Sequence, residues 1–343
     1  MKLVLDAMGG DSAPAETVAG AVDFARDSGH TIFLAGREAA IRAELAKHDT
    51  TGLDLPIVDA PDVISMEEKP AMAVRRKRNN SMVVGMKLVR EGEADAFCSV
   101  GNTGAILTAG HMVFRRIRGV QRAALATPFP NNKGFHILGD VGANTDCRPE
   151  WLVQWGHLLA IYAGARLNIQ NPSVALLSNG EEEGKGNDLV RATQTLMARE
   201  KGLNYIGVVE PKDMLEGAAN VVVTDGFTGN LVLKTSEAVG KYLLGILKQE
   251  IMARPLAKVG AALAKPAFRA AGARLDDKEY GAGMLLGLNG LVTVGHGRAK
   301  RDGVYAALKA TAQLVSADIL QKTKARTEIL MQIQKQEQGD PHE

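Results

Sequence analysis

The sequence predicts an α/β protein with a mostly parallel sheet, on three observations. Short apolar runs alternate with helical stretches along most of the 343 residues, which is the pattern of βαβ units with right-handed crossovers. Apolar residues make up 45% of the chain and aromatic residues only 4%, so the core should be large and aliphatic. Five loops rich in glycine and asparagine each follow an apolar run, where open parallel sheets bind their ligands.

The expected strands are short apolar runs bounded by turn residues. They cover residues 2–5, 31–35, 55–59, 94–100, 123–127, 136–138, 174–177, 205–208 and 221–224. The intervening stretches carry apolar residues at helical spacing. The clearest expected helices cover residues 13–28, 38–47, 71–91 and 103–116.

The segment from residue 231 to about 274 departs from this alternation. It has no strand signal and predicts helices broken near Pro255 and Pro266. Between Lys241 and Lys278, eight Lys and Arg residues face three Asp and Glu residues, whereas the whole chain carries a net charge of only +2. We therefore expect a single α/β catalytic domain over 1–343, with a basic helical protrusion at 240–277.

The end of the chain completes the expected elements. A polar amphipathic helix is expected over 313–336, followed by a frayed tail at 337–343.

Composition excludes several classes of protein. The two cysteines and the absence of a CxxC motif argue for a reducing compartment and against a disulfide scaffold or a zinc ribbon. No apolar run is long enough to span a membrane, and no signal peptide is evident. We expect a cytoplasmic protein, or one peripheral to the inner face of the plasma membrane.

One run of four cations, Arg75 to Arg78, could bind phosphate, nucleic acid or an acidic partner, or could be a solvated helix face. The few aromatic residues and the small net charge argue against a nucleic-acid-binding protein.

The five loops predict an anion site, above all one for phosphate. Glycines let backbone N–H groups approach a ligand, and helix N-termini add positive potential. The alternative is ordinary turns with Asn or Thr as helix caps. The candidate phosphate- and substrate-binding residues are Asp6, Gly9, Gly10, Asp11, Gly101, Asn102, Thr103, Gly104, Asn144, Asn179, Gly180, Gly186, Asn187, Gly226, Thr228 and Gly229.

Two familiar phosphate motifs are absent. The 179–187 loop lacks the spacing of a P-loop, and Gly186 rather than Ser or Thr follows Lys185. No G-x-G-x-x-G occurs, which counts against a conventional dehydrogenase. Lys185 lies between two glycines, where it could place its charge against a phosphate or belong to a solvated surface loop.

Three further residues are candidates for the chemistry. Asn230 could donate to a carbonyl oxygen, as an oxyanion hole does. Asp225 could manage a proton or orient a base, unless the segment is only a turn with a helix cap at Thr228. His296, between two glycines, could act as an acid or base near neutral pH, or be a turn histidine without a role.

Taken in order, these loops closely resemble the phosphate:acyl-[acyl-carrier-protein] acyltransferase (PlsX) family of bacterial phospholipid synthesis. The matching segments are 6–11, 99–105, 140–144, 177–187, 225–230, 279–281 with 285–287, and 296–297. One departure is Ala282-Gly283-Met284, where the family more often has Gly-Ala-Pro.

The resemblance implies a Rossmann-like three-layer αβα sandwich, related to phosphotransacetylases and isocitrate dehydrogenase, and a homodimer. It implies that acyl-[acyl-carrier protein] and inorganic phosphate give acyl phosphate and free carrier, with no cofactor or metal. The product would then feed a membrane glycerol-3-phosphate acyltransferase.

The basic segment then has two candidate roles besides packing in a dimer. Its cations, Lys248, Arg254, Lys258, Lys265 and Arg269, could contact an acidic carrier protein or an anionic membrane. The alternatives to an acyltransferase are an NAD-dependent dehydrogenase of the isocitrate dehydrogenase-like fold and a non-enzymatic phosphate- or lipid-binding module.

Overall fold

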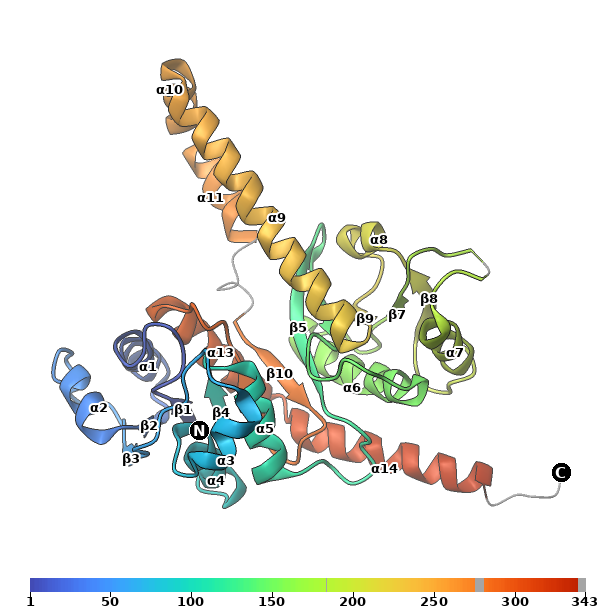
Figure 1. Ribbon diagram of the computed structural model, residues 1–343, viewed down its shortest axis with the longest axis horizontal. Coiled ribbons are helices and arrows are strands. Elements are labelled where there is room, and N and C mark those ends of the chain that lie inside the picture. The colour runs from blue at the N-terminus through green and yellow to red at the C-terminus, as the bar shows by residue number, and fades with distance from the viewer. Residues whose placement is uncertain (183, 275–280, 339–343) are drawn as a thin grey trace.

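The computed structural model describes residues 1–182, 184–274 and 281–338. Within them, eleven strands form one sheet in the order β3-β2-β1-β4-β11-β10-β5-β6-β9-β7-β8 (Figure 1). The strands are β1 (Lys2–Asp6), β2 (Thr31–Gly36), β3 (Ile57–Asp59), β4 (Ala96–Ser99), β5 (Ala124–Asn131), β6 (Gly134–Gly139), β7 (Val174–Leu177), β8 (Tyr205–Val209), β9 (Val221–Val223), β10 (Gly283–Leu286) and β11 (Val292–Val294). The nine expected strands are confirmed, whereas β10 and β11 were not expected.

The sheet consists of two parallel halves that run in opposite directions. Strands β3, β2, β1, β4 and β11 are parallel to one another, and so are β6, β9, β7 and β8. Between the halves, β10 is antiparallel to both of its neighbours and β5 is antiparallel to β6. The expectation that all five loops lie at one carboxyl edge is therefore wrong. The hairpin that closes between Asn131 and Gly134 reverses the chain, and the sequence pattern does not reveal this reversal.

The core is aliphatic on both faces of the sheet. Along β1, Leu3 and Leu5 pack into one cluster and Val4 into the other, and all three are fully buried. Because side chains alternate along a strand, a run that is apolar at every position marks a strand covered on both faces. Among the largest buried side chains are Trp155 and Tyr162, which both come from one helix.

Helices cover both faces of the sheet. Those before and around the first loops are α1 (Ala15–Ser28), α2 (Glu38–Leu45), α3 (Pro70–Arg76), α4 (Ser81–Arg90) and α5 (Thr103–Phe114). The remaining ones outside the protruding segment are α6 (Pro149–Leu167), α7 (Asp188–Met197), α8 (Pro211–Glu216), α13 (Arg301–Ser316) and α14 (Ile319–Gln338).

Two expected helices are in fact pairs. The 71–91 stretch breaks into α3 and α4 because the Asn80 side chain accepts from Val83 N (3.0 Å) and caps a new helix. The 313–336 stretch breaks between α13 and α14 at Asp318, whose φ is 52°. The first two residues of the expected tail, 337 and 338, belong to α14, and residues 339–343 lie outside the described residues.

The segment without strands forms three helices, α9 (Gly226–Ala253), α10 (Pro255–Leu263) and α11 (Lys265–Arg274). The helices break at Arg254 and Ala264, next to the two prolines that predicted the breaks. We call α9 from Gly240 onward, together with α10 and α11, the helical arm. It projects well away from the rest of the molecule (Figure 1). Across the described ranges, none of the helices has the length and apolar character needed to cross a membrane.

Candidate functional site

The loops after β1, β4 and β11 contact one another at the end of the first half-sheet. We call residues 6–11, 99–104 and 295–297 the amino-terminal loop cluster. Asp11 N donates to Gly297 O (2.8 Å), and Gly295 N donates to Ser99 O (2.9 Å). A Cβ on Gly9 would lie 2.9 Å from Gly101 N, so these backbones approach more closely than any other residue allows.

Asp6 lies at the centre of this cluster and is fully buried. Burial raises the pKa of its carboxyl, and hydrogen bonds from Ser99 Oγ (2.7 Å) and Met8 N (3.1 Å) oppose that rise. Asp6 thus ties the first two loops together from beneath.

Asn102 connects the cluster to the start of α5. Its Oδ1 accepts from Ala105 N (3.1 Å), and its Nδ2 donates to Met66 O (3.0 Å) and Glu68 O (3.3 Å). The alternative of a helix cap is therefore the geometry observed. The cap leaves the first N–H groups of α5, from Thr103 and Gly104, at the helix N-terminus, where an anion would be favoured.

A second group of loops lies at the end of the other half-sheet. We call residues 140–144 and 225–230 the carboxyl-terminal loop cluster. Asp140 is fully buried and accepts hydrogen bonds from five donors of Leu125, Gly142, Ala143 and Asn144, at 2.8–3.3 Å. Burial raises the pKa of this carboxyl and the hydrogen bonds oppose the rise. Asp140 plays the part here that Asp6 plays in the first cluster.

Asp225 is the N-cap of α9. Its Oδ1 accepts from Thr228 N (2.9 Å) and its Oδ2 from Thr228 Oγ1 (2.7 Å). The expected alternative cap at Thr228 is wrong by three residues, since Thr228 is the residue that is capped. Asn230 follows one turn later, is exposed, and faces Gly142 across the cluster.

The loop after β7 carries Lys185 and lies next to the second cluster, because β7 pairs with β9. Gly186 N donates to Asn179 Oδ1 (2.8 Å), and Asn187 caps α7 by accepting from Val190 N (2.9 Å). Lys185 is exposed, and no ion pair joins it to a carboxylate of the described residues.

Helix α9 spans the interval between the two clusters. It begins at Asp225 in the second cluster, and Glu237, about three turns on, reaches the first. Glu237 Oε1 lies 3.9 Å from His296 Nδ1, and Oε2 lies 3.7 Å from Arg298 Nη1. From Asn230 to Glu237 the helix rises about 10 Å, so both clusters border the same stretch of α9.

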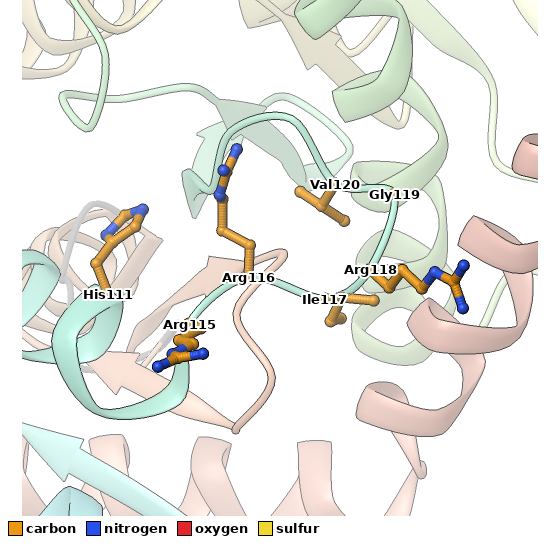
Figure 2. A pocket seen from close by; sticks show the side chains of 7 residues that line it. All are labelled: His111, Arg115, Arg116, Ile117, Arg118, Gly119 and Val120. Carbon is orange, nitrogen blue, oxygen red and sulfur yellow. The ribbon is translucent and has the colours of Figure 1, made fainter.

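Sequence reasoning missed three features of this region. Asp140 lies in the matching segment 140–144 but was not among the candidate site residues. An acid between glycines directly after a strand is the pattern that could have identified it. Glu237 has no signal beyond being an acid on a basic helix. The third is a cavity of about 460 Å³ outside both clusters, lined by His111 and the loop at residues 115–120 (Figure 2).

Possible metal ligands are sparse in what the structure describes. Within residues 1–182, 184–274 and 281–338, no three His, Cys, Asp or Glu side chains gather as metal ligands would. Cys98 is buried, and burial raises the pKa of the Cys147 thiol to about 11.

Comparison with known sequences gives close relatives over nearly the whole chain. The family model described as "Fatty acid synthesis protein" matches residues 1–322. The phosphate acyltransferase of Herpetosiphon aurantiacus is 45% identical and the match covers 93% of this chain and 96% of that protein. The phosphate acyltransferase of Pelotomaculum thermopropionicum is 43% identical over 96% of this chain and 95% of that one.

Solved structures share the fold at low sequence identity. A phosphotransacetylase from Streptococcus pyogenes matches with a TM-score of 0.63 at 16% identity, covering 92% of this chain and 94% of that one. The 4-hydroxythreonine-4-phosphate dehydrogenase of Klebsiella pneumoniae matches with a TM-score of 0.51 at 15% identity, covering 92% and 99%. The expected fold, related to phosphotransacetylases, is confirmed.

Proposed function

The chain belongs to the fatty acid synthesis protein family that contains these phosphate acyltransferases, and we propose that it transfers a fatty acyl group from acyl-[acyl-carrier protein] to inorganic phosphate. The products are acyl phosphate and free carrier protein, and this is the first step of a route to phospholipid. The observation that carries the proposal is the identity of 40–45% to phosphate acyltransferases, over at least nine-tenths of this chain.

The fold alone does not choose between the candidate activities, because both a transacetylase and a dehydrogenase share it. The sequence relatives favour the acyltransferase activity over the dehydrogenase activity, since those named above are all called phosphate acyltransferases. The residues of the clusters also suit a reaction that uses phosphate, because glycine-rich loops at helix N-termini offer backbone donors to an oxyanion.

In the proposed reaction a phosphate oxygen attacks the carbonyl carbon of the thioester. The tetrahedral intermediate then expels the carrier thiolate as the C–S bond breaks, and the thiolate takes up a proton. Because phosphate is the nucleophile, no side chain needs to form a covalent intermediate. Much of the rate would come from holding the two substrates in attack geometry and from donors aimed at the oxyanion.

We assign the phosphate to the helix N-termini at 101–104 and 185–187, with Lys185 offsetting its charge. Asn230 and neighbouring backbone N–H groups would hold the oxyanion. Support comes from the exposed positions of Lys185 and Asn230 beside their loops. It also comes from the capped starts of α5, α7 and α9, which leave free N–H groups there.

His296 is the better of the two candidates for the proton. Both carboxylate oxygens of Asp225 are engaged by Thr228. The His296 ring is about one-third exposed and has the Glu237 carboxylate nearby. A carboxylate beside an imidazole favours the protonated ring and fixes its orientation.

The proposed setting is cytoplasmic, at the inner face of the plasma membrane, with the chain acting as a homodimer. The helical arm would contact the membrane, where a glycerol-3-phosphate acyltransferase consumes the product. Its support is a surface with many exposed apolar side chains, Leu256 (87%) and Leu263 (81%) foremost, beside the cations expected from the sequence. Neutralising Lys248, Arg254 and Lys258 should weaken co-sedimentation with anionic vesicles, and persistence would argue against electrostatic binding.

The first test is to mix the purified chain with a long-chain acyl-carrier protein and to follow free carrier thiol. Release that requires inorganic phosphate is the expected result. Release without phosphate would mean a thioesterase-like activity. No release from a folded chain would shift the weight to the dehydrogenase and binding-module alternatives.

A further inference from the structure

The loop between α5 and β5 carries an unusual concentration of arginine. We call residues 115–122 the arginine loop; its four arginines, Arg115, Arg116, Arg118 and Arg122, are all exposed. The chain has no Asp or Glu from residue 96 to residue 139. Across the described part of the chain, no ion pair joins any of the four to a carboxylate. The loop is therefore a surface of unneutralised positive charge that the proposed reaction does not yet use.

The loop is held rigidly from two sides. Ile117 N donates to Gly287 O (2.9 Å), and Asn289 N donates to Arg115 O (3.0 Å), so the β10–β11 hairpin fixes its first half. Gln154 of α6 accepts from Gln121 N (2.8 Å) and donates to Gly119 O (2.8 Å), so α6 fixes its second half.

Apolar anchors complete the support. Ile117 and Val120 are buried at 6% and 5% exposure, while the arginines between and beside them point outward. A backbone fixed in advance presents charges to a partner at a low entropic cost. The rigidity of the loop therefore favours a role in docking a partner over a basic surface loop without a function.

The directions of the side chains indicate the size of the partner. Figure 2 shows Arg115, Arg116 and Arg118 spreading apart around the cavity instead of converging on one point. A single small anion needs converging donors, whereas carboxylates distributed over a protein surface match spread guanidinium groups. Arg122 lies over the ring of Trp151 (5.0 Å) and extends the same basic surface.

The position of the loop connects it to the proposed site. Helix α5 begins at Thr103, in the amino-terminal loop cluster, and ends at Phe114, beside the arginine loop. Its 12 residues span about 18 Å. The carrier protein holds its thioester on a flexible prosthetic group. From a carrier docked at the end of α5, that group could span the distance to the loop at residues 101–104.

We propose that the arginine loop, residues 115–122, is the surface on which the acidic acyl-carrier protein docks; this rests on the proposed function. The helical arm differs in kind, because its cations stand among exposed apolar side chains such as Leu256 and Leu263. That mixture suits a membrane, whereas the arginine loop buries its apolar side chains and exposes only charged and polar ones.

The test uses the full chain with Arg115 and Arg118 both changed to Glu, since neither side chain has a hydrogen bond or ion pair among the described residues. The initial rate of phosphate-dependent thiol release is measured against carrier-protein concentration, and separately with acyl-pantetheine, a thioester without a carrier. We expect kcat/KM for the acyl-carrier protein to fall more than about tenfold. The KM for phosphate and the rate with acyl-pantetheine should not change.

A matched control changes Arg199 and Lys201, two exposed cations between α7 and β8, to Glu and alters the net charge equally. It should leave kcat/KM for the carrier protein nearly unchanged. Equal losses in both variants would mean a general effect of net charge and would overturn the proposal. Loss with acyl-pantetheine as well would make the loop part of the reaction site and would also overturn it.

Two further outcomes separate this inference from its premise. A wild-type chain that releases no thiol would overturn the proposed function, and the docking surface with it. An active wild-type chain whose Arg115→Glu, Arg118→Glu variant keeps its carrier KM would overturn the docking surface alone. If that variant instead loses vesicle binding or binding to single-stranded DNA, the loop belongs to a membrane or nucleic-acid contact.

Discussion

Single glycines determine how closely the loops of the carboxyl-terminal cluster approach one another. A Cβ on Gly229 would lie 2.0 Å from the carbonyl oxygen of Asp140, and one on Gly226 would lie 2.4 Å from that of Asn144. Both obstructing atoms belong to the backbone, so no rotation of a side chain relieves the overlap.

We therefore expect Gly229→Ala to lower the free energy of unfolding by at least about 2 kcal/mol, the scale of overpacking in a tight interior. The control is Gly245→Ala, the same change on the same helix, where a Cβ would meet no atom within 4 Å. It should raise the free energy of unfolding by about 0.5–1 kcal/mol through helix propensity. Urea unfolding measures both, and equal effects would show that the approach of the two loops is looser than described.

His136 predicts a dependence of stability on pH. It is fully buried on β6, its Nδ1 accepts from Asn131 Nδ2 (3.1 Å), and its Nε2 has no partner among the described residues. Burial lowers its pKa from 6.5 to about 4. Between these values the unfolded chain binds a proton that the folded chain does not, so stability falls as the pH falls from 6.5 toward 4.

The full difference corresponds to about 3 kcal/mol. Replacing His136 by Phe should flatten the pH dependence, when the free energy of unfolding is compared from about pH 7.5 to about pH 5.5. Asp6 and Asp140, whose raised pKa values act in the opposite direction, are present in both chains, so the difference between the chains isolates His136. Parallel pH curves would mean that water reaches the ring.

Asp225, the N-cap of α9, has two candidate roles: it caps the helix, and it could also carry the proton in the reaction. A substitution by asparagine separates these roles. An asparagine at position 225 can still accept a hydrogen bond from Thr228 N, so Asp225→Asn should preserve the cap, whereas Asp225→Ala should destabilise the fold by about 1 kcal/mol. If Asp225 only caps, the Asn variant keeps its kcat for phosphate-dependent thiol release. If kcat instead collapses while thermal stability is retained, Asp225 handles the proton and our preference for His296 is wrong.

Elements were predicted well wherever local sequence decides them. The breaks at Arg254 and Ala264 follow from prolines, and the nine expected strands follow from apolar runs between turn residues. The 71–91 stretch was misjudged because its apolar spacing continues across a break that a single capping residue, Asn80, creates. Strands β10 and β11 were missed because their apolar runs are short, beginning at Gly283 and interrupted at Thr293, and pairing with each other, with β5 and with β4 stabilises them.

At the scale of the whole molecule, strand direction lay beyond what the sequence could reveal. Apolar runs specify strands but not which strands are neighbours or in which direction they run. The sequence pattern alone therefore predicts that the five loops lie at one edge of the sheet. In the structure the hairpin around Asn131 reverses the second half-sheet, and the loops divide into two clusters. The candidate residues were recognisable because their types suit phosphate, whereas their grouping depended on tertiary pairing.

Helix α9 contacts both loop clusters, and Glu237 is the residue that makes its contact with the amino-terminal loop cluster. Its carboxylate lies within 4.0 Å of Lys234, His296 and Arg298, so it joins α9 to the amino-terminal loop cluster. Glu237→Gln removes the charge and keeps the size of the side chain. Since the ring of His296 would lose its charged neighbour and must be protonated to supply the proton, we expect kcat to fall several-fold and the alkaline limb of the pH profile to shift to lower pH.

The control is Glu250→Gln, farther along the same helix, where the carboxylate pairs only with Arg254 among the described residues. An exposed pair of this kind contributes little to stability, so kcat, the pH profile and the free energy of unfolding should stay near wild-type values. A Glu237→Gln chain with lower kcat but an unshifted pH profile would show that Glu237 acts on the position of α9 and not on the ionisation of His296. An unchanged kcat would mean that the two halves of the sheet assemble their loops without this contact, and that the proton is carried from elsewhere in the site.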